Sequence, residues 1–227
     1  MLLAAGRGER MRPLTDHVPK PLLEAGGKSL IERHIVKLAA AKFERIIINH
    51  AYLGEQIEAA IGDGQRFGVS ISYSAEHEAL ETAGGIANAL DLIGSETFAV
   101  ANCDVYSDFD YGKLKFAAAA LGGEQGKLAH LVLVDNPAHN PGGDFALDGT
   151  RVSPADSNNL TFSGLAAYHR DLFVNIRRRE KAPLAPLLKA AARAGRITGE
   201  HHPGIWIDVG TPARLDALND LLTREKW

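Results

Sequence analysis

The sequence predicts an α/β fold with a mainly parallel sheet flanked by helices. Short apolar runs rich in Ile, Val, Leu and Ala alternate with amphipathic stretches, as in sheets covered on both faces. After Val134 the pattern changes, and turn residues become frequent. The chain has 227 residues, 45% of them hydrophobic, which suits one sizeable core. We therefore expect one domain over 1–227, with a first half at 1–134 and a second half at 135–227 that contains a smaller antiparallel part.

The first half contains the expected parallel strands and their helices. Each strand is a short aliphatic run, and each helix has apolar residues at helical spacing. Ser29 and Thr82 stand where N-caps satisfy the first free N–H groups of two helices. The strands are expected at Met1–Ala4, Arg45–Asn49, Val69–Tyr73, Phe98–Asn102 and Leu128–Val134, and the helices at Ser29–Ala41, Gly54–Ile61 and Thr82–Leu92.

The second half is richer in turns. The stretch "DNPAHNPGGDFALDGTRVSP" is full of Asn, Asp, Pro and Gly, and short strands are expected at Phe145–Leu147 and Thr161–Tyr168. This part reads as an antiparallel addition to the same domain. Two helices, Leu184–Arg193 and Pro212–Thr223, close the chain, and the second has a core stripe of Leu215, Leu218 and Leu222.

Composition excludes several classes of protein. A net charge of −3 and a pI near 6.3 provide no basic field for nucleic acid. The single cysteine, Cys103, excludes an internal disulfide framework and a multi-cysteine metal site. No apolar run approaches the roughly 20 residues that a membrane span needs, so we expect a cytoplasmic protein without a membrane partner. The short first strand also favours a few residues preceding Met1.

The stretch "LLAAGRGERMRPLT", Leu2 to Thr15, follows the first expected strand. It therefore forms a loop at the carboxyl edge of the sheet, where backbone N–H groups and arginines face a bound anion, with phosphate the expected one. Two familiar phosphate motifs do not fit. The dinucleotide fingerprint needs glycine where Met11 stands, and the P-loop needs glycine where Leu22 stands.

A string of motifs covers nearly the whole chain in order. It runs from "LAAGRGERMRPLT" and "PKPLLEAGGKSLIERHI" through "EHEALETAGGIANAL", "ANCDVYSD", "HNPGGDFAL" and "FSGLAAYH" to "WIDVGTP". This string resembles the sugar nucleotidyltransferases, and "ALETAGGI" and the chain length are similar to the bacterial N-acetylmuramic acid 1-phosphate uridylyltransferases of cell-wall recycling. The resemblance implies a GT-A-like (Rossmann-like) fold. It also implies uridylyl transfer from UTP to an N-acetylhexosamine 1-phosphate, with pyrophosphate released.

The same resemblance assigns roles to residues of this chain. Arg10 and Lys20 match the cations that act on the triphosphate, and Asp104 and Asp208 match the carboxylates that hold Mg²⁺. Hard oxygen ligands are what Mg²⁺ prefers, and cations suit a reaction between two polyanions. The half at 1–134 would bind the nucleotide and the half at 135–227 the sugar phosphate. The nucleotide positions are Ala5, Gly6, Gly8, Glu76, Thr82, Gly84 and Gly85, and the sugar positions are Gly143, Asp156, Asn158 and Gly164.

Several alternatives stay open from the sequence. Glu76 matches the residue that reads the base, yet a carboxylate accepts two N–H groups from guanine and one from uracil. Mannose-1-phosphate guanylyltransferase and glucose-1-phosphate nucleotidyltransferase activities therefore remain, as does a non-catalytic nucleotide-sugar binding or regulatory protein. Glu81 stands where relatives usually have glycine, and its purpose does not follow from the sequence. A homodimer through the antiparallel part is possible.

Other conspicuous residues are expected to be structural. Cys103 reads as a small buried side chain, because the implied chemistry needs no protein nucleophile. His201 and His202 lack a third ligand at any metal-binding spacing. Arg7 and Arg12 match no fixed motif position and are expected to be surface cations.

Overall fold

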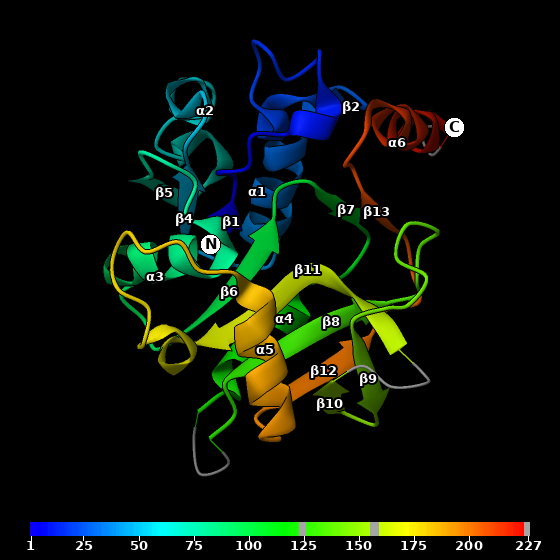
Figure 1. The fold of residues 1–227 in the computed structure, drawn as a ribbon. Coiled ribbons are helices and arrows are strands. Elements are labelled where there is room, and N and C mark those ends of the chain that lie inside the picture. The colour runs from blue at the N-terminus through cyan, green and yellow to red at the C-terminus, as the bar shows by residue number, and fades with distance from the viewer. Residues whose placement is uncertain (123–125, 155–158, 225–227) are drawn as a thin grey trace.

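A computed structural model describes residues 1–122, 126–154 and 159–224. Its centre is a nine-stranded sheet in the order β5-β4-β1-β6-β11-β8-β12-β10-β9 (Figure 1). Two small two-stranded sheets, β2-β3 and β7-β13, lie beside it. The strands are β1 (Leu2–Leu3), β2 (Glu24–Ala25), β3 (Lys28–Ser29), β4 (Arg45–His50), β5 (Ser70–Ala75), β6 (Thr97–Asn102), β7 (Val105–Ser107), β8 (Ala129–Val134), β9 (Phe145–Asp148), β10 (Arg151–Pro154), β11 (Asn159–His169), β12 (Ile197–His201) and β13 (Trp206–Asp208).

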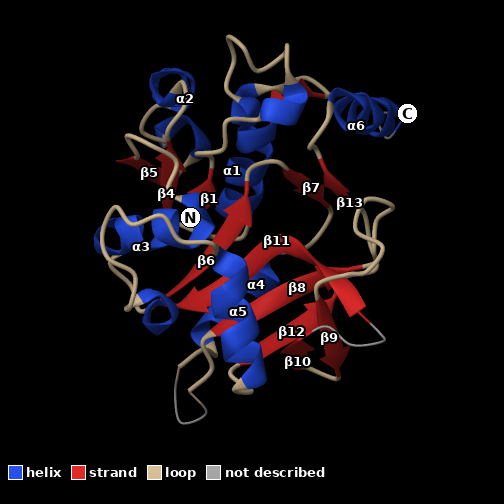
Figure 2. Cartoon of the chain, in the orientation of Figure 1, coloured by secondary structure: helices blue, strands red, loops and turns tan. Residues whose placement is uncertain are grey.

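Helices cover both faces of the large sheet, as expected (Figure 2). One face packs against α3 and α5, and the other packs against α1, α2 and α4. Strand β4 shows why a continuous aliphatic run was needed, because Ile46 and Ile48 face one helical layer and Ile47 faces the other. The helices are α1 (Leu30–Ala40), α2 (Gly54–Ile61), α3 (Glu81–Ile93), α4 (Tyr111–Ala119), α5 (Leu184–Arg193) and α6 (Pro212–Arg224).

The sheet is mixed, and its second half contains the expected antiparallel part. Strands β5, β4, β1 and β6 are parallel, and β11 pairs antiparallel with both β6 and β8. However, β12 runs parallel to β8, and only β9 and β10 form an antiparallel edge beyond it. Among the described residues, the strands of the second half therefore continue the same sheet with mainly antiparallel pairings, and the parallel pair β12–β8 is the exception.

The two predicted N-caps have different outcomes. Ser29 caps α1 in a capping box, since its side chain accepts from the Glu32 N–H and Glu32 accepts from the Ser29 N–H. Thr82 is not an N-cap, because α3 begins at Glu81. The free N–H groups of Ala83 and Gly84 instead donate to the carbonyl of Ala182, a residue distant in sequence.

The C-terminal helix α6 packs on the loop that follows β1. Leu215, Leu218 and Leu222 are buried in one cluster with Met11 and Leu23, which confirms the predicted stripe. This packing places the C-terminal helix next to the loop that contains Met11. Among the described residues, no helix has both the length and the apolar character that crossing a bilayer requires.

Candidate active site

Contacts within the protein fix the conformation of the loop after β1. Gly8 has φ +71°, and a Cβ there would lie 3.1 Å from Thr15 Cγ2 and 3.2 Å from Lys20 Cβ. The Thr15 hydroxyl donates to the Gly8 carbonyl at 2.9 Å. Arg7 donates to the Thr15 carbonyl and stacks 3.7 Å from the ring centre of Tyr52, so it braces the loop. Glycine at position 8 is therefore favoured by the left-handed backbone conformation and by the close approach of the Lys20 side chain.

Lys20 is the buried cation of this site. The residue is 8% exposed and begins the short 3-10 helix η2 (Lys20–Leu22). Its ammonium lies 2.6 Å from Oδ2 of Asp104, which follows β6 at the carboxyl edge of the sheet. Buried lysine is rare unless paired, so Asp104 accounts for its placement. The two residues thus meet at the edge where ligands bind in such sheets.

Two cavities adjoin at this ion pair. Both are lined by Gly6, Lys20 and Asp104. The first has a volume of about 220 Å³ and extends to Ala79, Glu81, Thr82, Asn49 and Asn102. The second has a volume of about 210 Å³ and extends to Gly8, Glu9, Arg10 and Gly210.

Asp208 is brought to the same edge by the small sheet. Strand β13 pairs antiparallel with β7 so that Asp208 lies opposite Val105, and the Val209 N–H donates to the Asp104 carbonyl at 2.8 Å. The two predicted metal carboxylates therefore occupy neighbouring backbone positions. Sequence alone could not show this, because β7 and β13 are only three residues long and lie far apart in the sequence, at 105–107 and 206–208.

Two side chains that the sequence interpretation missed, Arg214 and His139, contact Asp208. Arg214 Nη1 lies 2.6 Å from Asp208 Oδ2, and His139 Nε2 lies 3.3 Å from the same atom. Arg214 stands in the first turn of α6, directly after the "WIDVGTP" motif, so its place in the sequence was a usable signal. His139 is the first residue of the "HNPGGDFAL" motif, so its place in the sequence was also a usable signal.

Arg10 and Arg214 converge over Gly210. A Cβ at Gly210 would lie 3.0 Å from Asp208 Oδ1, 3.1 Å from Arg10 Nη2 and 3.2 Å from Arg214 Nη2. Any side chain there would therefore displace groups from both ends of the chain. The fold thus gathers Arg10, Lys20, Asp104 and Asp208 at one edge of the sheet.

Glu76 is buried behind the first cavity and does not line it. The residue is 6% exposed, and its two oxygens accept from Asn49 Nδ2 at 2.7 Å and from the Leu80 N–H at 2.9 Å. Burial raises the pKa of this carboxyl, while these hydrogen bonds oppose the increase. Asn49 in turn accepts from the Ala4 N–H at 3.0 Å. Glu76 therefore supports the end of β1 through Asn49.

The glycines of α3 are explained by contacts within the protein. A Cβ at Gly84 would lie 2.3 Å from the Glu180 carbonyl oxygen. At Gly85 it would lie 2.7 Å from both Asn49 Nδ2 and Glu76 Oε1. Gly85 is therefore needed to fit the Asn49–Glu76 pair against the helix, a reason that the sequence did not reveal.

Two of the predicted sugar positions, Gly143 and Gly164, are glycines in the left-handed region. Gly143 and Gly164 have φ values of +62° and +81°, and a Cβ at either would lie 2.7 Å from an asparagine side chain. Gly164 lies where the pairing of β11 with β8 shifts register, so a turn or bulge accounts for it. Asp156 and Asn158 lie outside the described residues.

The residues expected to be structural do have structural contacts. Cys103 is 1% exposed, and burial raises the pKa of its thiol. His201 and His202 pair with different carboxylates, Asp135 and Asp108. In the described part of the chain, no group of three or more His, Cys, Asp or Glu side chains is arranged to hold a metal ion.

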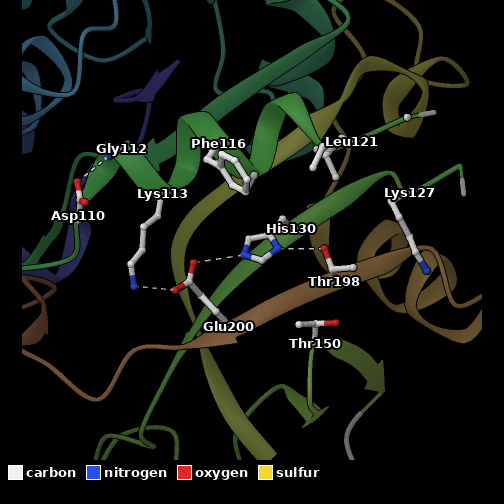
Figure 3. Close-up of a pocket in the computed structure, with 13 residues that line it drawn as sticks. Asp110, Gly112, Lys113, Phe116, Leu121, Lys127, His130, Thr150, Thr198 and Glu200 are labelled. Carbon is white, nitrogen blue, oxygen red and sulfur yellow. Dashed lines mark hydrogen bonds and ion pairs between the residues drawn. The ribbon is translucent and has the colours of Figure 1, made fainter.

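A larger cavity, about 900 Å³, lies along α4 and away from these residues (Figure 3). Figure 3 shows Glu200 between Lys113 and His130, with Thr198 on the other side of the imidazole. The residues that line it come from α4, β8 and β12 and the segments beside them, and among them is no residue of the loop after β1. Size alone therefore does not identify the site to which the motifs lead.

A glycine-containing loop, two cations and two carboxylates at the carboxyl edge of an α/β sheet are typical of proteins that bind phosphorylated ligands. The comparisons with known proteins agree with this class. The family described as "Nucleotidyl transferase" matches residues 1–225, and the chain belongs to that family.

Three relatives illustrate the likeness. An N-acetylmuramate alpha-1-phosphate uridylyltransferase of Neisseria meningitidis is 50% identical over 219 residues, covering 95% of this chain and 94% of the relative. A protein of the same description from Caulobacter vibrioides is 33% identical over 230 residues, covering 96% and 94%. A crystal structure from Bacillus anthracis, assigned as a glucose-1-phosphate thymidylyltransferase, superposes with a TM-score of 0.85 at 21% identity, covering 97% of this chain and 93% of that one. The last comparison supports the fold.

Proposed function

We propose that this chain transfers a uridylyl group from UTP to N-acetylmuramic acid 1-phosphate. The observation that carries the proposal is the convergence of Arg10, Lys20, Asp104 and Asp208 at one edge of the sheet. The relatives from Neisseria and Caulobacter support the choice of nucleotide and sugar, because both are described by this reaction. Because UTP is a cytoplasmic nucleotide, the reaction would take place in the cytoplasm.

The reaction is a displacement at phosphorus. An oxygen of the sugar 1-phosphate forms a bond to the α-phosphorus of UTP, and the bond from that phosphorus to the bridging oxygen of the β-phosphate breaks. The electron pair of the broken bond leaves with pyrophosphate, so the enzyme needs no nucleophile of its own. What it must supply is alignment and positive charge where two polyanions meet.

The cations of the site suit that task. The Lys20 ammonium is a point charge fixed by burial, and the Arg10 guanidinium can donate two parallel hydrogen bonds to phosphate oxygens. Opposite unit charges about 4 Å apart gain roughly 4 kcal/mol at an effective dielectric constant of 20. Each cation can therefore contribute orders of magnitude to the rate.

Asp104 and Asp208 form a donor set that fits Mg²⁺. They are hard oxygen ligands on neighbouring backbone positions, and Mg²⁺ takes one or two carboxylates together with water and phosphate oxygens. When bound, the ion would neutralise charge between the two phosphate groups.

The remaining assignments follow the two halves of the chain. We assign the nucleotide to the half at 1–134, through Ala5, Gly6, Gly8 and Thr82, and the sugar phosphate to the half at 135–227. The sugar half would use the loop around Gly143 and the bulge at Gly164. The proposal includes a homodimer formed through the second half of the chain. Light scattering would test this by measuring the molecular mass in solution.

Glu76 does not support the guanylyl alternative. Glu76 is buried, does not line the first cavity, and accepts from Asn49 and from the Leu80 N–H, so it does not present its carboxylate to a base in that cavity. A non-catalytic binding role remains the second candidate, because a site of this kind can retain a nucleotide without turnover.

The test is pyrophosphate release by the purified protein. UTP, GTP, dTTP, ATP and CTP are each combined with N-acetylmuramic acid, N-acetylglucosamine, glucose and mannose 1-phosphates, with Mg²⁺ or with chelator. Release that needs Mg²⁺, is fastest with UTP and N-acetylmuramic acid 1-phosphate, and disappears in Asp104→Ala supports the proposal. Fastest release with GTP and mannose 1-phosphate would replace it, and nucleotide binding without any release would favour the binding role.

A further inference from the structure

Glu81 has an unusual backbone conformation for its residue type. It is the first residue of α3 and has φ +60°, in the left-handed region that favours glycine. Glutamate has neither the missing Cβ of glycine nor the short polar side chain that helps Asn and Asp there. Such residues persist where the surrounding structure holds them, and they cluster at functional sites.

Glu81 lies at the first cavity and is exposed. Glu81 lines that cavity together with Thr82 and Asn102, whereas Arg10 and Gly210 line only the second. Since Lys20 and Asp104 line both, Glu81 lies on the side of the ion pair away from Arg10. If Arg10 and Lys20 take the phosphates, the first cavity takes the nucleoside.

The carboxylate of Glu81 is available to a ligand. Within the described residues it makes no hydrogen bond and no ion pair, in contrast to Glu76, whose two oxygens both accept from protein donors. A carboxylate near a triphosphate is repelled by it, so the nucleoside end is the part of the ligand that can approach Glu81 favourably.

We propose that Glu81, and not Glu76, is the carboxylate that reads the nucleobase, by accepting a hydrogen bond from its imino N–H. This inference rests on the proposed function. Uracil has an N–H at N3, whereas cytosine has a lone pair at the same position. Glu81 would therefore favour UTP and reject CTP, since a carboxylate facing that lone pair leaves both acceptors without a proton.

Three substitutions test the role of Glu81. Glu81→Gln keeps the size and can donate an N–H to N3 of cytosine, so we expect the ratio of kcat/KM for UTP to that for CTP to fall about tenfold or more. Glu81→Gly also lowers the ratio, and it raises Tm by ~2–4 °C because the left-handed strain is relieved. Glu76→Gln leaves the ratio unchanged.

Lys42 provides a matched control for the backbone effect. It also has a left-handed φ, +63°, and lies between α1 and β4, at the opposite edge of the sheet. Lys42→Gly should raise Tm as Glu81→Gly does, without any change in nucleotide preference.

Two results would overturn the inference. One is an unchanged ratio of kcat/KM for UTP to that for CTP in Glu81→Gln. The other is a decrease in kcat/KM that occurs with UTP and not with dUTP, which would assign Glu81 to the ribose 2′-hydroxyl. Calorimetric titration of UTP and CTP onto the wild type and Glu81→Gln separates this from failure of the proposed function. If no nucleotide and sugar phosphate give pyrophosphate, the proposed function fails, while the two binding affinities still report on Glu81.

Discussion

The ammonium of Lys20 lies 2.6 Å from Oδ2 of Asp104, across a sequence separation of 84 residues. The Lys20 side chain is 10% exposed and that of Asp104 is 36% exposed, so the lysine is fixed by packing while the carboxylate still faces the cavities. The pair therefore joins a cation suited to phosphate with a carboxylate suited to a metal ion.

Removing the Lys20 charge should slow turnover without unfolding the protein. We expect Lys20→Met to lower kcat/KM by ~10²- to 10³-fold, because its methylenes remain packed while a positioned cation is lost. Pyrophosphate release under saturating Mg²⁺ measures this. Lys28→Met, at an exposed position on β3, is the control and should be near wild type.

Asp104→Asn combined with Lys20→Met tests the pairing itself. The two losses should not add, since residues in direct contact share an interaction energy. Strictly additive losses would show that the 2.6 Å contact has no energetic role in the reaction.

The sequence predicted the parallel half well because its signals are local. Strands β4, β5, β6 and β8 and helices α1 and α2 lie within one or two residues of the expected ranges, since aliphatic runs and the Ser29 cap are properties of short segments. No range was predicted for helix α4, because "YGKLKFAAA" has little amphipathic periodicity, although Asp110 was interpreted as a helix-start residue and is its N-cap. The predicted Thr82 cap failed because the Ala182 carbonyl, which is distant in sequence, takes its place.

The sequence predicted which charged residues form the site, but not which side chains contact one another there. Arg10, Lys20, Asp104 and Asp208 do meet at one edge, as their motifs implied. The partners Arg214 and His139 and the buried position of Glu76 depend on contacts between distant segments. No single-residue pattern encodes such contacts, so the structure was needed to distinguish Glu76 from Glu81.

Gly85→Ala should destabilise the protein although alanine favours helices. The new methyl group would lie 2.7 Å from Asn49 Nδ2 and Glu76 Oε1, within a buried hydrogen bond. Overpacking of this kind costs about 1–3 kcal/mol, against a propensity gain of about 1 kcal/mol. Urea unfolding measures the net loss. Gly142→Ala, where a Cβ meets nothing within 4 Å, is the control, and equal stabilities of the two variants would contradict the clash.

The free energy of unfolding should fall as the pH is lowered from 6.5 towards 4, because burial lowers the pKa of His34 in the folded protein. His34 is 3% exposed, its Nδ1 lies 2.7 Å from the Tyr111 hydroxyl, and burial lowers its pKa from 6.5 to about 4. The nearby Lys37 lowers this pKa further, whereas Asp104 raises it. The unfolded chain binds the proton first, so stability is lost as pH falls from 6.5 towards 4, by up to about 3 kcal/mol.

The comparison of His34→Gln with the wild type isolates this effect. Urea unfolding at several pH values measures the free energy of unfolding. Between pH 6.5 and 4.5 it should depend less on pH in His34→Gln than in the wild type, while His77→Gln, at an exposed position, should keep the wild-type dependence. A slope unchanged in His34→Gln would mean that other groups cause the acid sensitivity.

Leu218→Ala should weaken both the fold and the site, because α6 connects them. Leu218 is fully buried in the cluster that contains Met11 of the loop after β1 and Val209, three residues before the start of the helix at 212. Truncation should cost about 2–5 kcal/mol. Since the same helix carries Arg214 and the same loop carries Arg10, a loosened α6 should also lower kcat at temperatures well below Tm. Asp220→Ala, exposed on the same helix, should change neither property. A variant with lowered Tm and unchanged kcat would show that α6 supports the fold without positioning the two arginines.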